Sequence, residues 1–502
     1  MRVARAAAGA GLVGLLATGC GTTVPLAQQA SGSGLTSEGG TSLAAGRPSA
    51  AGATNDGPPG ATSATTSTGA QGGVPSAGLA NVPGLPTDGP AAAGGLAASG
   101  RGWTSTTVSI GVITNQDIST FANTLGISSL DSGDSRGDSE AILAELNARG
   151  GLFGRKVKGI YYDVKTTDNQ ESSAQATCSY FTKDHPVVAV IAGAVESDTP
   201  TFRGCMASAN VPVIAGGAQP FDDKVFRDLQ GRYLQLTLPT WDVLSTPFVA
   251  SLQKDGYFSG WSTTTGAPGP APVKVGLLSL DTPIGHRVIG TLSRALARDG
   301  HAPVETIYYA NQSSVSAAVL RFVADGITHV ISTDQFLFLF MNTASSQGYQ
   351  PRYGVSTANA PGLLLQGTAP AKQLVGSLGF GVLPGLDVDA AHDRTPPAWK
   401  ACAAMAKRHG VAYPADHRFA TAVLGEYCDG YQLILGGAQR VGSFAPQLLL
   451  RGIEQVAATL PSAFTFSNGL SITRYTRPGS GAPLAYDTGC SCYRYSGTLR
   501  AF

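Results

Sequence analysis

The feature of this sequence that most constrains its fold is a repeated alternation of short apolar segments with longer amphipathic ones. A first group of strand-like runs rich in Val and Ile occupies residues 107–113, 156–163, 187–193 and 211–216. A second group occupies residues 273–280, 303–310 and 328–333. Helix-like segments separate the runs, and this alternation is typical of parallel sheets covered by helices on both faces. We therefore predict an α/β fold of two lobes, each built on a doubly wound parallel sheet.

Helix signals agree with this organisation. Ile142, Leu143 and Leu146 share one face of a predicted helix, and Gly150 and Gly151 supply its end. A short helix is expected to begin at an N-cap, Asp198. Longer helices are predicted near the C-terminal end of the chain, at about 396–409, 417–440 and 443–457, before an extended tail rich in Gly and Pro.

The N-terminus carries an export signal. Arg2 and Arg5 precede a run of small and apolar residues that ends at Cys20, and this run is too short to span a bilayer. Residues 16–20 resemble a bacterial lipobox, in which a signal peptidase cuts before a cysteine that then carries a lipid. We predict a signal peptide at 1–19 and a lipid-anchored Cys20, because two acyl chains give stable anchoring. The alternative is an ordinary cleaved signal with an incidental cysteine.

The next segment is too polar and too small in its side chains to form a core. Residues 21–100 contain no aromatic residue and four charged ones. Such a chain does not bury enough apolar surface to offset its ordering entropy. We predict that residues 20–105 form a disordered linker between the membrane anchor and a folded body.

Charge excludes one class of partner. The 34 Lys and Arg residues nearly balance the 33 Asp and Glu residues, without any run of basic residues. A nucleic-acid-binding protein normally carries a basic face, so we expect no nucleic-acid partner.

Six cysteines follow Cys20, and an even number in an exported protein favours disulfides. Cys178 and Cys205 lie on successive helices and are the first predicted pair; Cys402 and Cys428 are the second. Cys490 and Cys492 remain, and a bond between them would close a tight, strained ring. Sequence leaves three pairings open among the last four. A redox or metal site at the Cys-Ser-Cys motif is the alternative, although no histidine cluster supports it.

Known catalytic motifs do not occur. The chain lacks a Gly-x-Ser-x-Gly elbow, a His-Glu-x-x-His helix and a phosphate loop, and its seven histidines are scattered. We expect no enzyme activity, no cofactor and no bound metal.

Several motifs in order resemble one family. The stretch 147–156 reads NARGGLFGRK and precedes a strand that ends at Asp163. It is followed by VVAVIAGAVESDT, NVPVIAGGAQP and VKVGLLSLDTPIG in the order typical of leucine/isoleucine/valine-binding periplasmic proteins. The resemblance covers about residues 106–440.

This resemblance implies the type I periplasmic binding protein fold, with two lobes joined by a three-strand hinge and a ligand held between them. We expect lobe 1 at 106–238, with about 378–460 returning to it. Lobe 2 is expected at 239–377, with about 461–502 returning to it. The implied function is that of the solute-binding subunit of an ABC-type importer, a monomer that delivers its ligand to a membrane permease.

The family's ligand loops map onto named positions. The resemblance places the first ligand loop of lobe 1 at Ser197, Asp198 and Thr199, and the second at Gly217, Ala218 and Gln219. In lobe 2 it places Asp281 and Ile284 in a turn that has an aromatic residue in the family. Thr199 and Ser197 have a plainer alternative role as helix caps, and Asp281 as a turn residue.

One departure from the family concerns charge. The acid that would hold an α-ammonium group falls near Ser356 or Thr357, where no carboxylate stands. Asp334, at the end of an adjoining strand, is the expected substitute. Because a desolvated ammonium without a partner is costly, the expected ligand is a small polar solute: an amino acid, an amide, a carboxylate or a short peptide. The alternatives are a lipoprotein that senses its ligand and signals to a membrane partner, and a secreted hydrolase.

Overall fold

The computed structural model describes residues 97–502, except positions 116, 121–130, 194–198, 218–219, 416 and 472. The predicted signal peptide, Cys20 and most of the linker lie outside the described residues. Within the described part, no helix has both the length and the apolar character needed to cross a membrane.

The first lobe is built on a parallel sheet with strand order β2-β1-β3-β4-β5. Its strands are β1 (Thr107–Thr114), β2 (Lys156–Asp163), β3 (Val190–Ala192), β4 (Val213–Ala215) and β5 (Tyr233–Gln235). Successive side chains of a strand point to opposite faces of the sheet, and helices cover both faces, so side chains on both faces are buried. On β1, Val108, Ile110 and Val112 face one apolar cluster and Ile113 faces the other.

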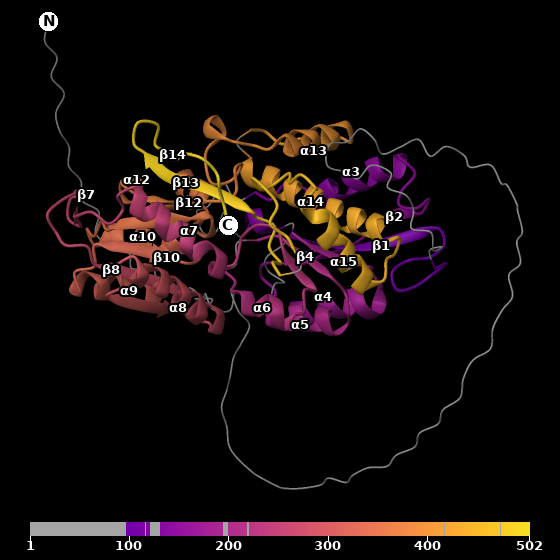
Figure 1. Cartoon of the computed structure of the whole chain (residues 1–502), viewed down its shortest axis with the longest axis horizontal. Coiled ribbons are helices and arrows are strands. Elements are labelled where there is room, and N and C mark those ends of the chain that lie inside the picture. The colour runs from indigo at the N-terminus through magenta and orange to yellow at the C-terminus, as the bar shows by residue number, and fades with distance from the viewer. Residues whose placement is uncertain are drawn as a thin grey trace, which may run out of the picture.

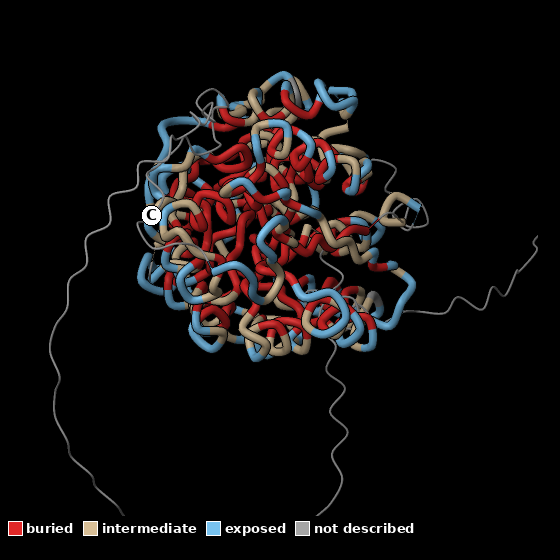
Figure 2. The backbone as a smooth tube through the Cα atoms, turned by 90° about the vertical axis from the view of Figure 1, so that its right-hand side faces the viewer, coloured by how far each residue is buried: buried red, intermediate tan, exposed pale blue. Residues whose placement is uncertain are grey.

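Helices cover both faces of this sheet. One face packs against α3 (Ser135–Ala148), α13 (Pro397–Arg408), α14 (Arg418–Val441) and α15 (Pro446–Ala457). The other packs against α4 (Gln170–Ser179), α5 (Pro200–Ser208) and α6 (Asp223–Asp228). Figure 1 shows these layers on the right, and Figure 2, turned to face that end, shows buried residues through the interior.

The second lobe has a mixed sheet with strand order β14-β13-β12-β11-β10-β8-β9, and β15 pairs with β13. Its parallel strands are β8 (Val275–Leu280), β9 (Glu305–Tyr309), β10 (His329–Ser332), β11 (Arg352–Ser356) and β12 (Leu378–Gly381). The predicted extended tail adds three antiparallel strands: β13 (Ser480–Asp487), β14 (Cys492–Tyr495) and β15 (Arg500–Ala501).

This second sheet is also covered on both faces (Figure 1, left). One face packs against α9 (Gln312–Ala324), α10 (Leu337–Ser346) and α12 (Ala371–Leu374). The other packs against α7 (Trp241–Lys254) and α8 (Pro283–Arg298). Residues 256–272 form the short hairpin of β6 (Trp261–Ser262) and β7 (Ala267–Pro268), which Trp261 holds to the lobe through a 2.9 Å bond to the Gln350 carbonyl.

The chain passes between the lobes three times: from β5 to α7, from β12 to α13, and from α15 to β13. The predicted α/β fold with two doubly wound lobes is therefore observed. Residues 378–381, which the sequence assigned to the return into lobe 1, form β12 of the second sheet because their backbone pairs with β11 and β13.

The folded body begins earlier than the sequence indicated. Arg101 and Trp103 fall within the predicted linker, yet Trp103 packs on the first-lobe core and the Arg101 guanidinium donates to the carbonyls of Thr182 and Ala209. An isolated aromatic residue and an arginine after a polar segment are enough to anchor this segment beside β1, because they bury apolar area and satisfy buried carbonyls.

The part of the chain that the structure describes contains three disulfides. Two have the predicted pairings, Cys178–Cys205 between α4 and α5 and Cys402–Cys428 between α13 and α14. The third joins Cys490 and Cys492 at the turn between β13 and β14. The first two each clamp neighbouring helices within the first lobe.

Candidate functional site

The two lobes meet where strands of both parallel sheets end. Arg287, in the first turns of α8, pairs with Asp222, which follows β4; its Nη2 lies 3.0 Å from the Asp222 Oδ1. Ile284, also on α8, contacts the apolar clusters of both lobes. The carboxyl ends of β4 and β8 are therefore close to each other across the boundary. In open α/β sheets this edge is where ligands bind.

A glycine turn follows β4 at this edge. Gly217 has a positive φ of 91°, and its carbonyl accepts bonds from the side chains of Gln235 (2.9 Å) and Thr237. A Cβ on the preceding residue, Gly216, would overlap the carboxylate of Glu426 on α14. The side chains of Gln235 and Thr237 thus fix the turn through hydrogen bonds, and the turn packs directly against the buried carboxyl group of Glu426.

Glu426 is the most unusual group at this edge. Burial raises its pKa from 4.5 to about 8, although a bond from the Gly217 backbone N–H lowers it. Its charged neighbour is Asp429, one turn further along α14, and no basic group among the described residues pairs with it. A neutral carboxyl group at pH 7 both donates and accepts a hydrogen bond, so it suits an amide or a carboxylate.

The Glu426 carboxyl makes a testable contribution to pH-dependent stability. Because its pKa is higher in the folded chain, the folded state binds more protons between pH 4.5 and about 8. The free energy of unfolding therefore falls as pH rises through this window, by at most about 1.4 kcal/mol per pH unit from this group. We expect Glu426→Gln to remove this slope, as measured by urea unfolding from pH 4 to 9.

The same substitution at an exposed glutamate provides the control for that experiment. Glu140 on α3 is half exposed in its pair with Arg136, so Glu140→Gln should leave the pH slope unchanged. If Glu426→Gln and Glu140→Gln give the same pH profile as the unaltered chain, Glu426 ionises normally and is not the neutral group described above.

The other loops of the first lobe contribute polar groups. Thr199 is buried, and its hydroxyl accepts a 3.1 Å bond from the Phe202 N–H, so Thr199 rather than Asp198 is the N-cap of α5. The predicted site residues Ser197, Asp198, Ala218 and Gln219 lie outside the described residues. Asn115, directly after β1, is buried, and its Nδ2 has no partner among the described groups.

Asp281 and Ile284 of the second lobe lie at the lobe boundary but differ in role. Asp281 is exposed, and its carboxylate lies 2.9 Å from the Nε2 of His286, whose ring stacks on Tyr308. Ile284 is half-buried between the lobes. The turn therefore presents a contact between Asp281 and His286 to solvent and the apolar Ile284 side chain to the first lobe.

The two remaining predicted positions are committed to internal bonds. Asp334 follows β10 and is fully buried; its carboxylate accepts from the Tyr309 hydroxyl and from the Phe336 N–H at 2.9 Å. Burial raises the pKa of Asp334 to about 6, although the Tyr309 bond lowers it. The Thr357 hydroxyl donates to the buried Asp387 carboxylate at 2.6 Å. Both residues hold loops at the carboxyl edge of the second sheet.

The sequence interpretation missed Glu426 and Asn115. The sequence signal for Glu426 was its position as an acidic residue in a mainly apolar helical segment. Asp429 is the other acidic residue of that helix, α14. Asp429 pairs with buried Arg477, whereas Glu426 faces the glycine turn. Distinguishing the two acids required the tertiary structure.

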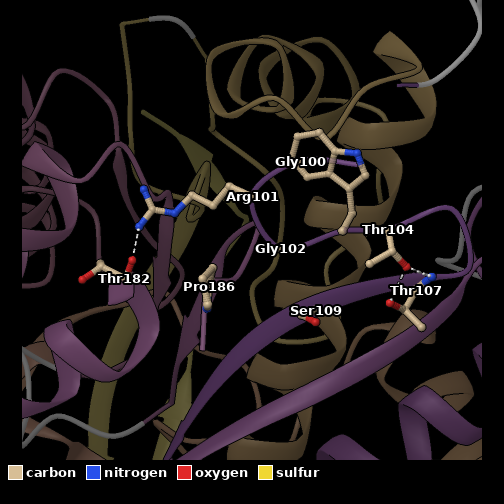
Figure 3. Close-up of a pocket in the computed structure, with 9 residues that line it drawn as sticks. Gly100, Arg101, Gly102, Thr104, Thr107, Ser109, Thr182 and Pro186 are labelled. Atoms are coloured by element: carbon tan, nitrogen blue, oxygen red, sulfur yellow. Dashed lines mark hydrogen bonds between the residues drawn. The ribbon is translucent and has the colours of Figure 1, made fainter. Parts of the chain in front are cut away.

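A separate cavity lies at the opposite end of the first sheet. It has a volume of about 450 Å³ and is lined by residues 100–104 together with Thr107, Ser109, Thr182 and Pro186. Figure 3 shows the Arg101 side chain turned toward Thr182. Its lining includes the first half of β1, so it lies away from the carboxyl edge. We assign it to the docking of the segment before β1 and not to ligand binding.

Comparisons with known proteins agree with this geometry. A family model described as "Periplasmic binding protein" matches residues 107–471. A search of curated proteins finds no match.

Solved structures share the fold at low sequence identity. A branched-chain amino acid ABC transporter protein from Thermus thermophilus with bound valine is 12% identical, has a TM-score of 0.56, and covers 79% of this chain and 97% of its own. A Rhodopseudomonas palustris solute-binding protein in complex with 4-hydroxybenzoate is 12% identical, with a TM-score of 0.55 and coverage of 79% and 97%. A fatty acid ABC transporter substrate-binding protein from Thermomonospora curvata is 16% identical, with a TM-score of 0.55 and coverage of 80% and 95%.

Proposed function

We propose that this chain, which belongs to the periplasmic binding protein family of ABC transporter solute-binding proteins, captures a small polar solute between its lobes. It would then deliver the solute to a membrane permease. The observation that carries the proposal is the meeting of the two sheets at their strand carboxyl ends, where Asp222 and Arg287 join the lobes beside a fixed glycine turn. Three chain crossings allow such lobes to bend relative to each other.

The site chemistry supports a ligand with hydrogen-bonding groups. A neutral Glu426 beside the glycine turn would donate a hydrogen bond to a carboxylate or amide oxygen. We propose that the loops containing Ser197, Asp198 and Thr199, and Gly217, Ala218 and Gln219, hold this group from the first lobe.

The second lobe would complete the binding site. We propose that Asp281, Ile284, Asp334 and Thr357 border the ligand there, with Asp334 and Thr357 acting through the loops that their internal bonds fix. The Asp334 carboxylate already accepts bonds from Tyr309 and Phe336, and the neutral Glu426 carboxyl would serve as a hydrogen-bond partner and not as the counter-ion of an ammonium group. An amino acid, an amide, a carboxylate and a short peptide are therefore the solute classes to test.

The family places the protein outside the cytoplasm. We propose in addition that the lipid on Cys20 anchors it to the outer face of the cytoplasmic membrane and that residues 20 to about 96 act as the linker. The anchored body would then stay within reach of a permease while remaining monomeric.

A thermal-shift screen of residues 97–502 against amino acids, amides, carboxylates, short peptides and sugars tests the proposal. A solute present at 100 times its dissociation constant should stabilise the folded chain by about 2.7 kcal/mol, which is several degrees of melting temperature. Chromatography should recover the solute unchanged. Consumption of the solute would indicate a hydrolase, and a solute that binds but is not taken up by cells carrying the transporter would indicate a sensor.

The loop assignment is tested in the same assay. Ser197→Ala combined with Gln219→Ala should weaken binding at least tenfold, because each removes one ligand hydrogen bond of about 1 kcal/mol or more. Ser346→Ala combined with Gln347→Ala makes the same chemical change at exposed positions of α10 and its end, and it should leave affinity unchanged. Equal affinity in both double variants would place the ligand elsewhere.

A further inference from the structure

The turn between β13 and β14 brings a histidine against two cysteines. Cys490, Cys492 and His392 each offer a donor atom, and these three atoms lie within 4.8 Å of one another. The His392 Nδ1 is 3.5 Å from the Cys492 Sγ, although the two residues are 100 positions apart in sequence. Among the residues that the structure describes, this is the one cluster of metal-binding side chains of this kind.

Asp389 holds the histidine in place through two contacts to one carboxylate oxygen. His392 ends a 3-10 turn, η5 (Ala390–His392), whose N-cap is Asp389. The Asp389 carboxylate accepts from the His392 backbone N–H at 3.0 Å and lies 2.6 Å from its Nδ1. Nearby, the Arg394 guanidinium donates to the Tyr495 carbonyl of β14 at 2.9 Å. The segment after β12 is thereby fixed to the hairpin that carries the cysteines.

The donor set matches the preferences of Zn²⁺. Thiolate, imidazole and carboxylate groups in a four-coordinate arrangement are the usual zinc ligands, and thiolates disfavour Mg²⁺ and Ca²⁺. Cys492 is buried and His392 is about one-quarter exposed, so an ion can enter from one side. Asp389 lies 2.6 Å from the same ring nitrogen, outside the cluster of three donor atoms, and would be the fourth ligand.

We propose that Cys490, Cys492 and His392, with Asp389, form a Zn²⁺ site that the Cys490–Cys492 disulfide closes and its reduction opens. A dithiol reductant breaks the S–S bond by exchange: two electrons and two protons pass to the cysteine pair, and the reductant becomes a disulfide. Zn²⁺ then displaces the two thiol protons to solvent and takes the place of the proton between His392 Nδ1 and Asp389.

The site joins parts of the chain with different tasks. His392 lies on the second crossing between the lobes, from β12 to α13, and the cysteines lie on the second-lobe hairpin. A bound ion would add a cross-link between that crossing and the second sheet. The proposal does not depend on which solute the protein binds.

Zinc titration of the full purified chain tests this site. Reduced under nitrogen and freed of reductant, the chain should bind one equivalent of Zn²⁺ more than the reduced Cys490→Ser/Cys492→Ser variant, measured against a chromophoric chelator. The comparison cancels any binding by the other five cysteines. Co²⁺ should give the visible absorption of a tetrahedral thiolate site in the first protein only. The unreduced chain should bind no equivalent at this site.

The role of His392 needs its own comparison. His392→Ala in the reduced chain should lower Zn²⁺ affinity at least about tenfold, whereas His185→Ala, at an exposed position away from the cluster, should not. Thermal unfolding of each variant checks that it remains folded. Equal Zn²⁺ uptake by the reduced chain and the Cys490→Ser/Cys492→Ser variant, or an unchanged affinity in His392→Ala, would overturn the proposal.

Discussion

Arg477→Ala is expected to lower the free energy of unfolding by about 3–5 kcal/mol, because it leaves a buried carboxylate without its cation. The Arg477 Nε lies 3.0 Å from the Asp429 Oδ2, and neither side chain is exposed by more than 1%. Burial lowers the pKa of Arg477 and raises the pKa of Asp429. Each charged group is therefore desolvated, and its attraction to the other offsets that cost. The bonds from Ser462 and from the Ala463 N–H to Asp429 do not replace the lost charge.

A surface pair provides the control for this prediction. Arg136 and Glu140 on α3 form an i,i+4 pair in which each side chain is 54% exposed. Arg136→Ala should change the free energy of unfolding by no more than about 0.5 kcal/mol. Urea denaturation at pH 7 compares the two variants directly. A loss below 1 kcal/mol for Arg477→Ala would mean that water reaches the pair and that the segment before β13 is not firmly joined to α14.

Gly452→Ala is the second substitution with a large expected effect, a loss of about 1–3 kcal/mol. Helices α14 and α15 cross with their backbones in contact: a Cβ on Gly452 would overlap the carbonyl oxygen of Gly437. A Cβ on Gly437 would in turn meet Ile453. The methyl group must therefore push α15 away from α14, which disrupts the packing of the first-lobe core on that face.

The opposite sign is expected at a glycine with free space around it. Gly204 lies inside α5, and no atom comes within 4 Å of the position of its missing Cβ. Gly204→Ala should stabilise the chain by roughly 0.5–1 kcal/mol, because alanine favours the helix. Thermal or urea unfolding measures both variants. If Gly452→Ala is neutral or stabilising, α15 packs more loosely on α14 than the structure indicates.

The sequence predicts those parts of the fold whose signals are local. Strands β1, β2 and β8 have six to eight residues each, and the prediction places them within two residues of the observed bounds. The strand β5 (Tyr233–Gln235) is missed because its segment alternates apolar and polar residues and lacks the continuous apolar run of the equally short β3 and β4. Strand β12 contains two glycines, so its place in the second sheet depends on pairing with β11 and β13.

The candidate site is less accessible to sequence reasoning. The family resemblance identifies the loops, but Thr199 acts as a helix cap, and the Asp334 carboxylate is taken by Tyr309. Glu426 contacts the turn after β4 although more than 200 residues separate them, and His392 meets Cys492 from 100 positions away. Such contacts are set by chain topology, and no local pattern encodes them.

The central claim is that a single solute binds between two lobes and draws them together. Small-angle X-ray scattering during a titration with the solute found by the screen tests it most directly. We predict saturation at one solute per chain, with a smaller radius of gyration in the bound form. Saturable binding at any other stoichiometry, or binding that leaves the radius of gyration unchanged, would contradict the claim.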